Sequence, residues 1–148
     1  MKKMIIIAIL LSSCKLKQQD IGKESEKEMM ETDIAMSHLA TKEGFYKALL
    51  HYADDSVIIP RAGNLPLIGK TEVATNWLTK PDFTTLTWKP IKGEASKTGD
   101  IGYTFGYATF VGKDTITYSN YCTIWKKQKD GSWKFIYDGG NTIPKPNY

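Results

Sequence analysis

The sequence predicts an α+β domain in which a curved, mostly antiparallel sheet of about six strands wraps around N-terminal helices and encloses a pocket. Apolar residues recur at helical spacing between residues 33 and 53. Fourteen of the 17 aromatic residues lie from Trp77 onward, in strand-length runs separated by Gly-Asp and Asp-Gly pairs. A chain of 148 residues can form one such core and is too short for two.

Residues 1–13 have the composition of a secretory signal peptide. Two lysines precede an apolar run over residues 4–11, which is too short to cross the ~30 Å hydrocarbon core of a bilayer. The Leu-Ser-Ser-Cys14 sequence that closes the run resembles the bacterial lipobox. This resemblance implies cleavage before Cys14 and lipid attachment there, with membrane lipid as a partner. We therefore expect a lipid-anchored protein of the bacterial cell envelope, on the periplasmic side or the cell surface.

Residues 14–31 form a charged segment with few branched apolar side chains, which is typical of a tether. The folded domain is then expected over residues 32–148. Thr32 or Asp33 can cap its first helix. Gly44 predicts a break before a second helix.

Shorter elements follow these helices. Residues 57–59 predict a strand that Pro60 ends, and residues 65–68 predict a second strand. A helix is expected from Gly69 to about Leu78. The remaining chain predicts four long antiparallel strands, at residues 84–97, 100–111, 115–128 and 132–139.

Turn chemistry predicts how the last three strands pair. A three-residue turn ending at Gly131 pairs Lys126 with Lys134 and sorts charged from aromatic side chains. The same reasoning across residues 112–114 places Thr109 opposite Thr117. The predicted concave face then consists of Tyr103, Phe105, Tyr107, Ser119, Tyr121, Thr123, Trp125, Trp133, Phe135 and Tyr137.

Aromatic rings and hydroxyl groups alternate on this face, whereas a dry core is filled by aliphatic side chains. The face therefore predicts a pocket for a small, partly apolar molecule. The ligand-binding residues expected there are Tyr103, Phe105, Tyr107, Tyr121, Trp125 and Phe135. The opposite face carries small and aliphatic side chains that suit a homodimer interface: Ala108, Cys122, Ile124 and Ile136, with glycines between them.

Charge and motif content exclude several classes of function. The formal net charge is +4 and falls further without the two lysines of the signal peptide, so no electrostatic footprint for nucleic acid is present. The chain has two histidines and no paired-cysteine or HExxH motif. We expect no nucleic-acid partner, no metal site and no cofactor.

The order of the elements resembles the cone-shaped superfamily that includes nuclear transport factor two, ketosteroid isomerase and SnoaL-like polyketide cyclases. The resemblance covers residues 33–142 and implies a SnoaL-like cone with an internal pocket. Such a fold serves many activities and does not by itself assign one. It rests on five short motifs in order and a final aspartate: Tyr52–Val57, Leu67–Lys70, Gly99–Thr104, Tyr121–Lys127, Asp130–Lys134 and Asp138.

The isomerases of this superfamily use an aspartate immediately before a proline in the first-strand region, but here Ile59 precedes Pro60. Strict alternation puts Asp138 on the outer face, and a bulge near residues 139–140 would turn it inward. Catalytic residues are therefore unassigned. The leading hypothesis is a pocket that binds a small, partly apolar molecule.

Two alternatives stay open beside the binding module. The first is an isomerase, cyclase or hydrolase that acts in the same pocket, and the second is a dimerising module without ligand. A closed, filled interior favours the dimerising module. A carboxylate facing a tyrosine inside the cavity favours an enzyme, and an open cavity without such a carboxylate favours binding alone.

Overall fold

The computed structural model describes residues 20–147, so the predicted signal peptide and Cys14 lie outside the described residues. The helices are α1 (Ile21–Glu43), α2 (Phe45–Tyr52) and α3 (Lys70–Trp77). The strands are β1 (Ala53–Arg61), β2 (Asn64–Ile68), β3 (Leu86–Ala95), β4 (Ile101–Val111), β5 (Ile116–Lys127) and β6 (Trp133–Ile143). Within this part of the chain, no helix is both long enough and apolar enough to span a membrane.

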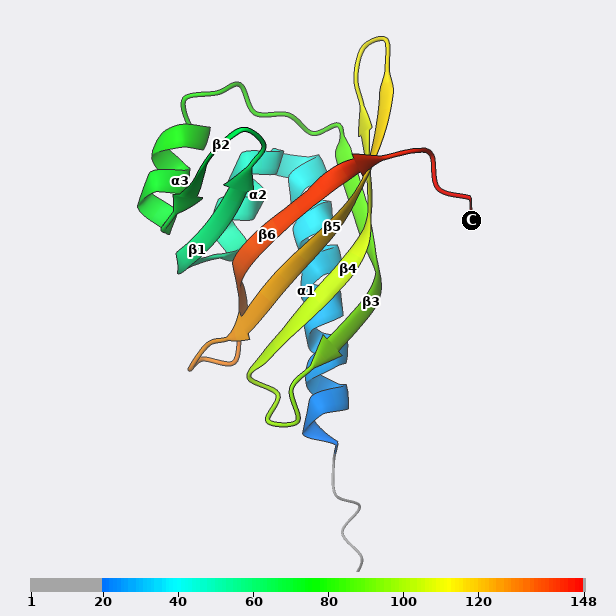
Figure 1. Ribbon diagram of the computed structural model, residues 1–148. Helices are drawn as coiled ribbons and strands as arrows, with labels where there is room; N and C mark the ends of the chain where they lie inside the picture. The colour runs from blue at the N-terminus through cyan, green and yellow to red at the C-terminus, as the bar shows by residue number, and fades with distance from the viewer. Residues whose placement is uncertain (1–19, 148) are drawn as a thin grey trace, which may run out of the picture.

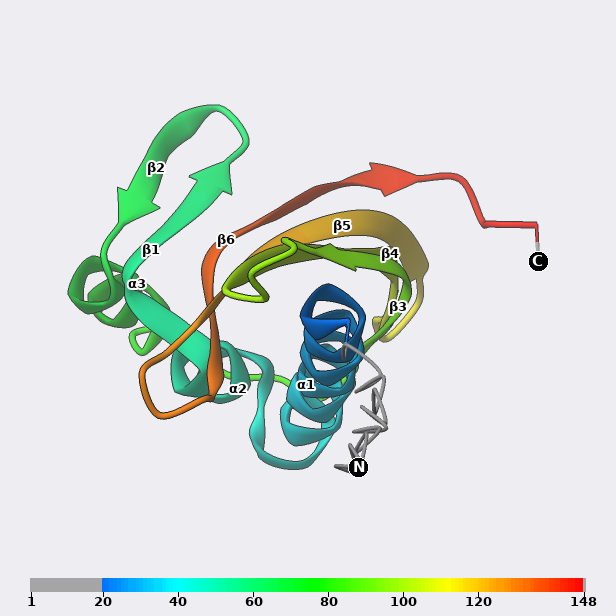
Figure 2. The same cartoon turned by 90° about the horizontal axis from the view of Figure 1, so that it is seen from below.

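The six strands form one curved sheet in the order β2-β1-β6-β5-β4-β3 (Figure 1). Within the described chain only the β1–β6 pair is parallel. The sheet curls around α1, which Figure 2 shows nearly end-on, while α2 and α3 lie beside β1. The predicted α+β class and mostly antiparallel curved sheet are confirmed.

Helix α1 begins at Ile21, well before the predicted start of the domain. The Asp20 side chain caps it by accepting a hydrogen bond from the backbone N–H of Lys23 at 3.3 Å. Residues 21–31, predicted to belong to the tether, are therefore the first turns of a core helix. Their buried face consists of small or flexible side chains, which composition alone does not distinguish from a polar tether: Gly22, Ser25 and Met29.

The predicted break at Gly44 is confirmed, because this glycine has a φ of +114° between the two helices. The predicted cap at residue 32 or 33 is wrong. Asp33 lies in the middle of α1 and is completely buried.

The β5–β6 turn has the predicted register. Lys126 pairs with Lys134, Trp125 pairs with Phe135, and Gly131 has a φ of +86°. This left-handed conformation costs a glycine little, because it has no Cβ.

The β4–β5 hairpin is shifted by one residue from its predicted register. Thr117 pairs with Phe110 rather than with Thr109, and the turn is closed by a hydrogen bond from the Gly112 N–H to the carbonyl oxygen of Thr115. Because side chains alternate along a strand, a shift of one residue moves every β4 side chain to the other face. The predicted pocket residues Tyr103, Phe105 and Tyr107 consequently lie on the convex face. The inner face of β4 consists of Gly102, Thr104, Gly106 and Ala108.

A β-bulge in β6 changes the alternation a second time. Trp125 pairs with Phe135 and Ile124 pairs with Tyr137, so Ile136 is the extra residue. The bulge turns Tyr137 outward, contrary to its predicted place on the concave face. It turns Asp138 inward, opposite Thr123.

Candidate functional site

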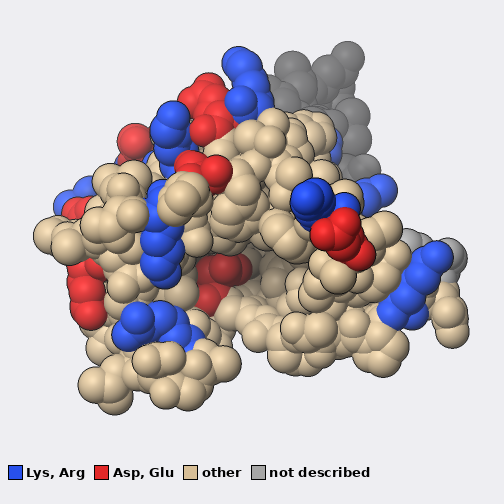
Figure 3. Space-filling model, turned by 90° about the horizontal axis from the view of Figure 1, so that it is seen from above, with Lys and Arg blue, Asp and Glu red and all other residues tan. Residues whose placement is uncertain are grey.

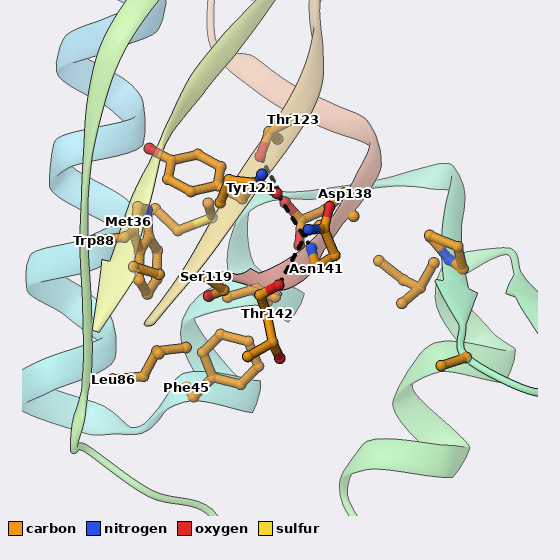
Figure 4. Close-up of a pocket in the computed structure, with 18 of the residues that line it drawn as sticks. Met36, Phe45, Leu86, Trp88, Ser119, Tyr121, Thr123, Asp138, Asn141 and Thr142 are labelled. Carbon is orange, nitrogen blue, oxygen red and sulfur yellow. Dashed lines mark hydrogen bonds between the residues drawn. The ribbon is translucent and has the colours of Figure 1, made fainter. Parts of the chain in front are cut away.

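A pocket of about 540 Å³ opens at one end of the cone. In the space-filling view this face is hollowed, and acidic atoms lie within the hollow (Figure 3). The walls come from α1, α2, α3 and five strands, and Figure 4 shows how the labelled side chains converge on the cavity. Its principal lining side chains are Met36, Phe45, Leu49, Ile59, Trp77, Leu86, Trp88, Ser119, Tyr121, Thr123 and Asp138.

Asp138 is the only acidic side chain among the described residues that line this pocket. Its carboxylate accepts a hydrogen bond of 2.6 Å from the hydroxyl of Thr123 on the neighbouring strand. Protein surrounds the carboxyl group except toward the pocket, and burial raises its pKa to about 6. The negative charge of Asp33 acts in the same direction. Asp138 is therefore a carboxyl group that changes protonation close to neutral pH.

Asp33 lies behind the pocket wall and has several hydrogen-bond donors. Tyr121 Oη and Trp88 Nε1 each donate to it at 2.8 Å, and the Thr104 hydroxyl is a third partner. Thr104 in turn accepts a hydrogen bond of 2.9 Å from Trp125 Nε1. Burial raises the pKa of Asp33, and the three hydrogen bonds oppose this rise. This network joins α1 to β3, β4 and β5.

Gly106 allows the Tyr121 ring to cross β4 and reach Asp33. A Cβ at position 106 would lie 2.8 Å from both the ring and the hydroxyl of Tyr121. No side chain other than hydrogen fits at that distance. The glycine and the tyrosine are paired across the two strands, so the sheet register itself creates this space.

Aromatic rings form the apolar part of the wall. The Phe45 ring lies 6.3 Å from that of Trp77 and 6.1 Å from that of Trp88, measured between ring centroids. These three side chains come from α2, α3 and β3. Such ring arrangements combine apolar surface with a partially negative face.

Of the six residues predicted to bind a ligand, the structure places Tyr121 at the pocket. Trp125 and Phe135 have no exposed surface, and they pack against each other beneath it with ring centroids 5.9 Å apart. The other three are the convex-face residues of β4. Ala108, predicted for the outer face, lines the pocket instead.

Sequence reasoning missed Asp33 and left Asp138 undecided. A signal for Asp33 was present in the spacing of Met29, Asp33, Met36 and Ala40, which all lie on the buried stripe of α1. No local signal marks the bulge that turns Asp138 inward. Among residues 20–147, no group of three or more His, Cys, Asp or Glu side chains is arranged to hold a metal ion.

No family model matches the chain, and neither does any curated protein. Solved structures are similar to it. A ketosteroid isomerase-like protein from Erwinia carotovora atroseptica matches with a TM-score of 0.65 and 17% identity, over 82% of this chain and 98% of that chain. An NTF2-like superfamily protein from Salmonella enterica matches with a TM-score of 0.62 and 11% identity, over 84% of this chain and 95% of that one.

A protein from Catenulispora acidiphila, solved in complex with S-DNPA, has a TM-score of 0.55 and 8% identity, over 78% of this chain and 91% of that chain. At these identities the likeness is one of fold. The domain therefore has the NTF2-like, ketosteroid isomerase-like cone fold, as the resemblance implied.

Proposed function

We propose that this NTF2-like domain binds a small, partly apolar molecule in its pocket and transfers a proton to or from it through Asp138. The observation that carries the proposal is the position of Asp138 on the inner wall of an open pocket that Tyr121 also lines. A carboxylate and a tyrosine in one cavity favour an enzyme over a simple binding module. The complex of the Catenulispora protein with S-DNPA supports ligand binding by this fold.

The protonation behaviour of Asp138 suits general acid–base chemistry. A carboxyl group with a pKa of about 6 is mostly ionised at neutral pH and still returns a proton readily. The apolar side chains of the wall lower the local polarity, which strengthens the electrostatic interactions of this carboxyl group. Isomerisation, cyclisation and hydrolysis can each use such a proton transfer, and the geometry does not separate these reaction classes.

Nitrobenzisoxazole is a suitable probe for this activity. A base removes its one acidic carbon-bound proton, the ring N–O bond then breaks, and a coloured cyanonitrophenolate forms without any co-reactant. We expect the purified chain to catalyse this reaction. The rate should rise with pH through about 6, because only the ionised Asp138 accepts a proton. The other titratable groups near it are Asp33, Tyr121 and Cys122, and the pKa of each is also raised.

Asp138→Asn should lower the rate at least about 100-fold, since it keeps the shape of the side chain and removes the base. Asp55→Asn is the matched control, because Asp55 is exposed and outside the pocket. Circular dichroism will show whether the Asp138→Asn variant folds. A folded variant with the wild-type rate would contradict the proposal.

We further infer that the chain is attached to a bacterial membrane by lipid on Cys14. The lipobox-like sequence supports this, and the two cysteines of the chain offer a matched pair of variants. Cys14→Ala should move the protein from the detergent phase to the aqueous phase in a phase-partition experiment. Cys122→Ala should leave it in the detergent phase. Recovery of both variants with detergent would rule out the anchor.

Self-association through the convex face is a second proposal. In addition to Ile124, the face carries the half-buried side chains Tyr103, Phe105 and Tyr107. Sedimentation velocity should show a dimer that Ile124→Lys dissociates. The control Leu78→Lys, at a position 64% exposed at the end of α3 and off the sheet, should leave it intact, and a monomeric wild type would exclude the interface.

A further inference from the structure

Asp138 supplies hydrogen-bond acceptors to the polar part of the pocket wall, beside the hydroxyl and amide groups of Ser119, Asn120, Asn141 and Thr142. One oxygen of Asp138 accepts from Thr123. Its second oxygen has no hydrogen-bond partner in the described chain. Every buried side-chain oxygen or nitrogen among the described residues has such a partner. The second oxygen is therefore not buried, and it is open to the pocket that Asp138 lines. A ligand that meets it must supply a donor.

Tyr121 reinforces this polarity. Its single hydroxyl proton is donated to Asp33 at 2.8 Å, behind the pocket wall, so Tyr121 offers no hydroxyl proton to a ligand. Asp33 also places a second acidic group behind the same wall, close enough for its charge to act on Asp138. Both features favour a ligand group that donates hydrogen bonds and carries positive charge.

No basic side chain offsets these two acids. Among residues 20–147 the pocket is lined by no Lys, Arg or His side chain. The ion pairs in this part of the chain lie on the surface of α1 and between Lys127 and Glu28, away from the pocket lining. Charges withdrawn from water are normally paired in proteins, and Asp138 has no cationic partner among the described residues.

The aromatic walls add to the attraction. Phe45, Trp77, Trp88 and Tyr121 all line the cavity. The face of an aromatic ring attracts a cation within about 6 Å of its centroid, and this attraction grows when water is excluded. An anionic ligand would meet the Asp138 carboxylate, the negative charge of Asp33 behind the wall and these negative ring faces.

We propose that the natural ligand of this pocket is an organic cation: an amine with an apolar body, whose ammonium group pairs with Asp138. This inference rests on the same pocket and carboxylate as the proposed function and adds the charge of the substrate. It does not require that the bound molecule be turned over.

Three probes of nearly equal size test the charge preference: phenethylammonium, phenethyl alcohol and phenylacetate. Binding to the purified chain can be followed at pH 8, where Asp138 is ionised, through the indole N–H signals of ¹⁵N-labelled tryptophan. Trp77 and Trp88 line the pocket, and Trp88 Nε1 reports directly on the Asp33 network. We expect the ammonium probe to bind about tenfold tighter than the alcohol, and the carboxylate to bind weakest.

Asp138→Asn should reduce the preference of the ammonium probe over the alcohol to within about twofold, whereas Asp55→Asn should preserve it. Equal or tighter binding of phenylacetate would overturn the inference, as would a preference that survives in Asp138→Asn. The outcome is separable from that of the nitrobenzisoxazole assay, because that probe is neutral. Charge preference without turnover refutes only the proposed proton transfer, and turnover without charge preference refutes only the cationic ligand.

Discussion

Asp33 on α1 and Asp138 on β6 have the same chemistry and different surroundings, because Asp33 is fully buried and Asp138 is partly exposed at the pocket. Asp33 has no exposed surface and is hydrogen-bonded to Tyr121, Trp88 and Thr104. Within the described part of the chain, Asp138 has a single donor, Thr123, and an oxygen open to the pocket. Burial raises the pKa of both carboxyl groups.

The difference separates a structural role from a functional one. The hydrogen bonds of Asp33 connect three strands to the central helix, so its charge is used within the fold. Asp138 has one hydrogen-bond donor among residues 20–147, and a partly buried charge with few partners lowers stability. Residues that reduce stability in this way are often kept for binding or catalysis. The following predictions test this division, from the largest expected effect to the smallest.

Asp33→Asn should give the largest loss of stability. The asparagine NH2 group is a donor, and it would face side chains that already donate to Asp33. The donors on both sides would then be buried without acceptors. We expect the free energy of unfolding to fall by about 3–5 kcal/mol, measured by urea denaturation with tryptophan fluorescence. A loss below about 1 kcal/mol would show that the network contributes little to the fold.

Asp138→Asn should have the opposite sign at high pH. The pKa of Asp138 rises from 3.8 to about 6 in the folded state, so between these values the folded protein binds more protons than the unfolded chain. Its contribution to stability is therefore complete below about pH 4 and is lost as pH rises through about 6. The variant should be more stable than wild type by about 1–3 kcal/mol at pH 8.

The same variant provides an internal control for this effect. At pH 3.5 the Asp138 side chain of the wild type is neutral in the folded protein and largely neutral in the unfolded chain, as the asparagine of the variant always is. The stability gained by the substitution should therefore disappear at this pH. Asp33 is present in both the wild type and the variant, so its pH dependence cancels from the difference in stability between them. A variant that is less stable than wild type at pH 8 would show that Asp138 is a structural residue like Asp33.

Tyr121→Phe removes one donor from Asp33 while keeping the ring in the pocket wall. Because the hydrogen bond is made to a buried acidic group, we expect a loss of about 1.5 kcal/mol. Tyr103→Phe is the matched control, since its hydroxyl makes an exposed contact of 3.4 Å with Glu94 and should matter by less than about 0.5 kcal/mol. Equal effects of the two variants would argue against the Asp33 network.

Thr123→Val is expected to have the smallest effect. It removes the Thr123 hydroxyl that donates to Asp138 and keeps a side chain of similar shape. Because that hydrogen bond favours the ionised form, its loss should move the pH midpoint of nitrobenzisoxazole turnover upward from about 6. An unchanged or lower midpoint would mean that the turnover does not report on Asp138.

Sequence reasoning succeeded where local chemistry decides the structure. The break at Gly44 and the turn at Gly131 were both predicted, and each requires a positive φ that glycine adopts easily. The order of helices and strands was also predicted, because hydrophobic periodicity and turn residues act over short distances. Of the predicted concave face, Ser119, Tyr121 and Thr123 line the pocket, and Tyr121 is the one of the six expected ligand-binding residues that does so.

The sequence by itself determined the fold class, the element order and the mixture of aromatic and hydroxyl groups available to a pocket. Tertiary structure decided which of those groups face inward, through the one-residue register of β4 on β5 and the bulge at Ile136. Strand side chains alternate with a period of two, so a single residue of register or bulge exchanges the inner and outer faces. That choice depends on packing against α1 across long sequence separations, where Asp33 meets Tyr121 and Trp88.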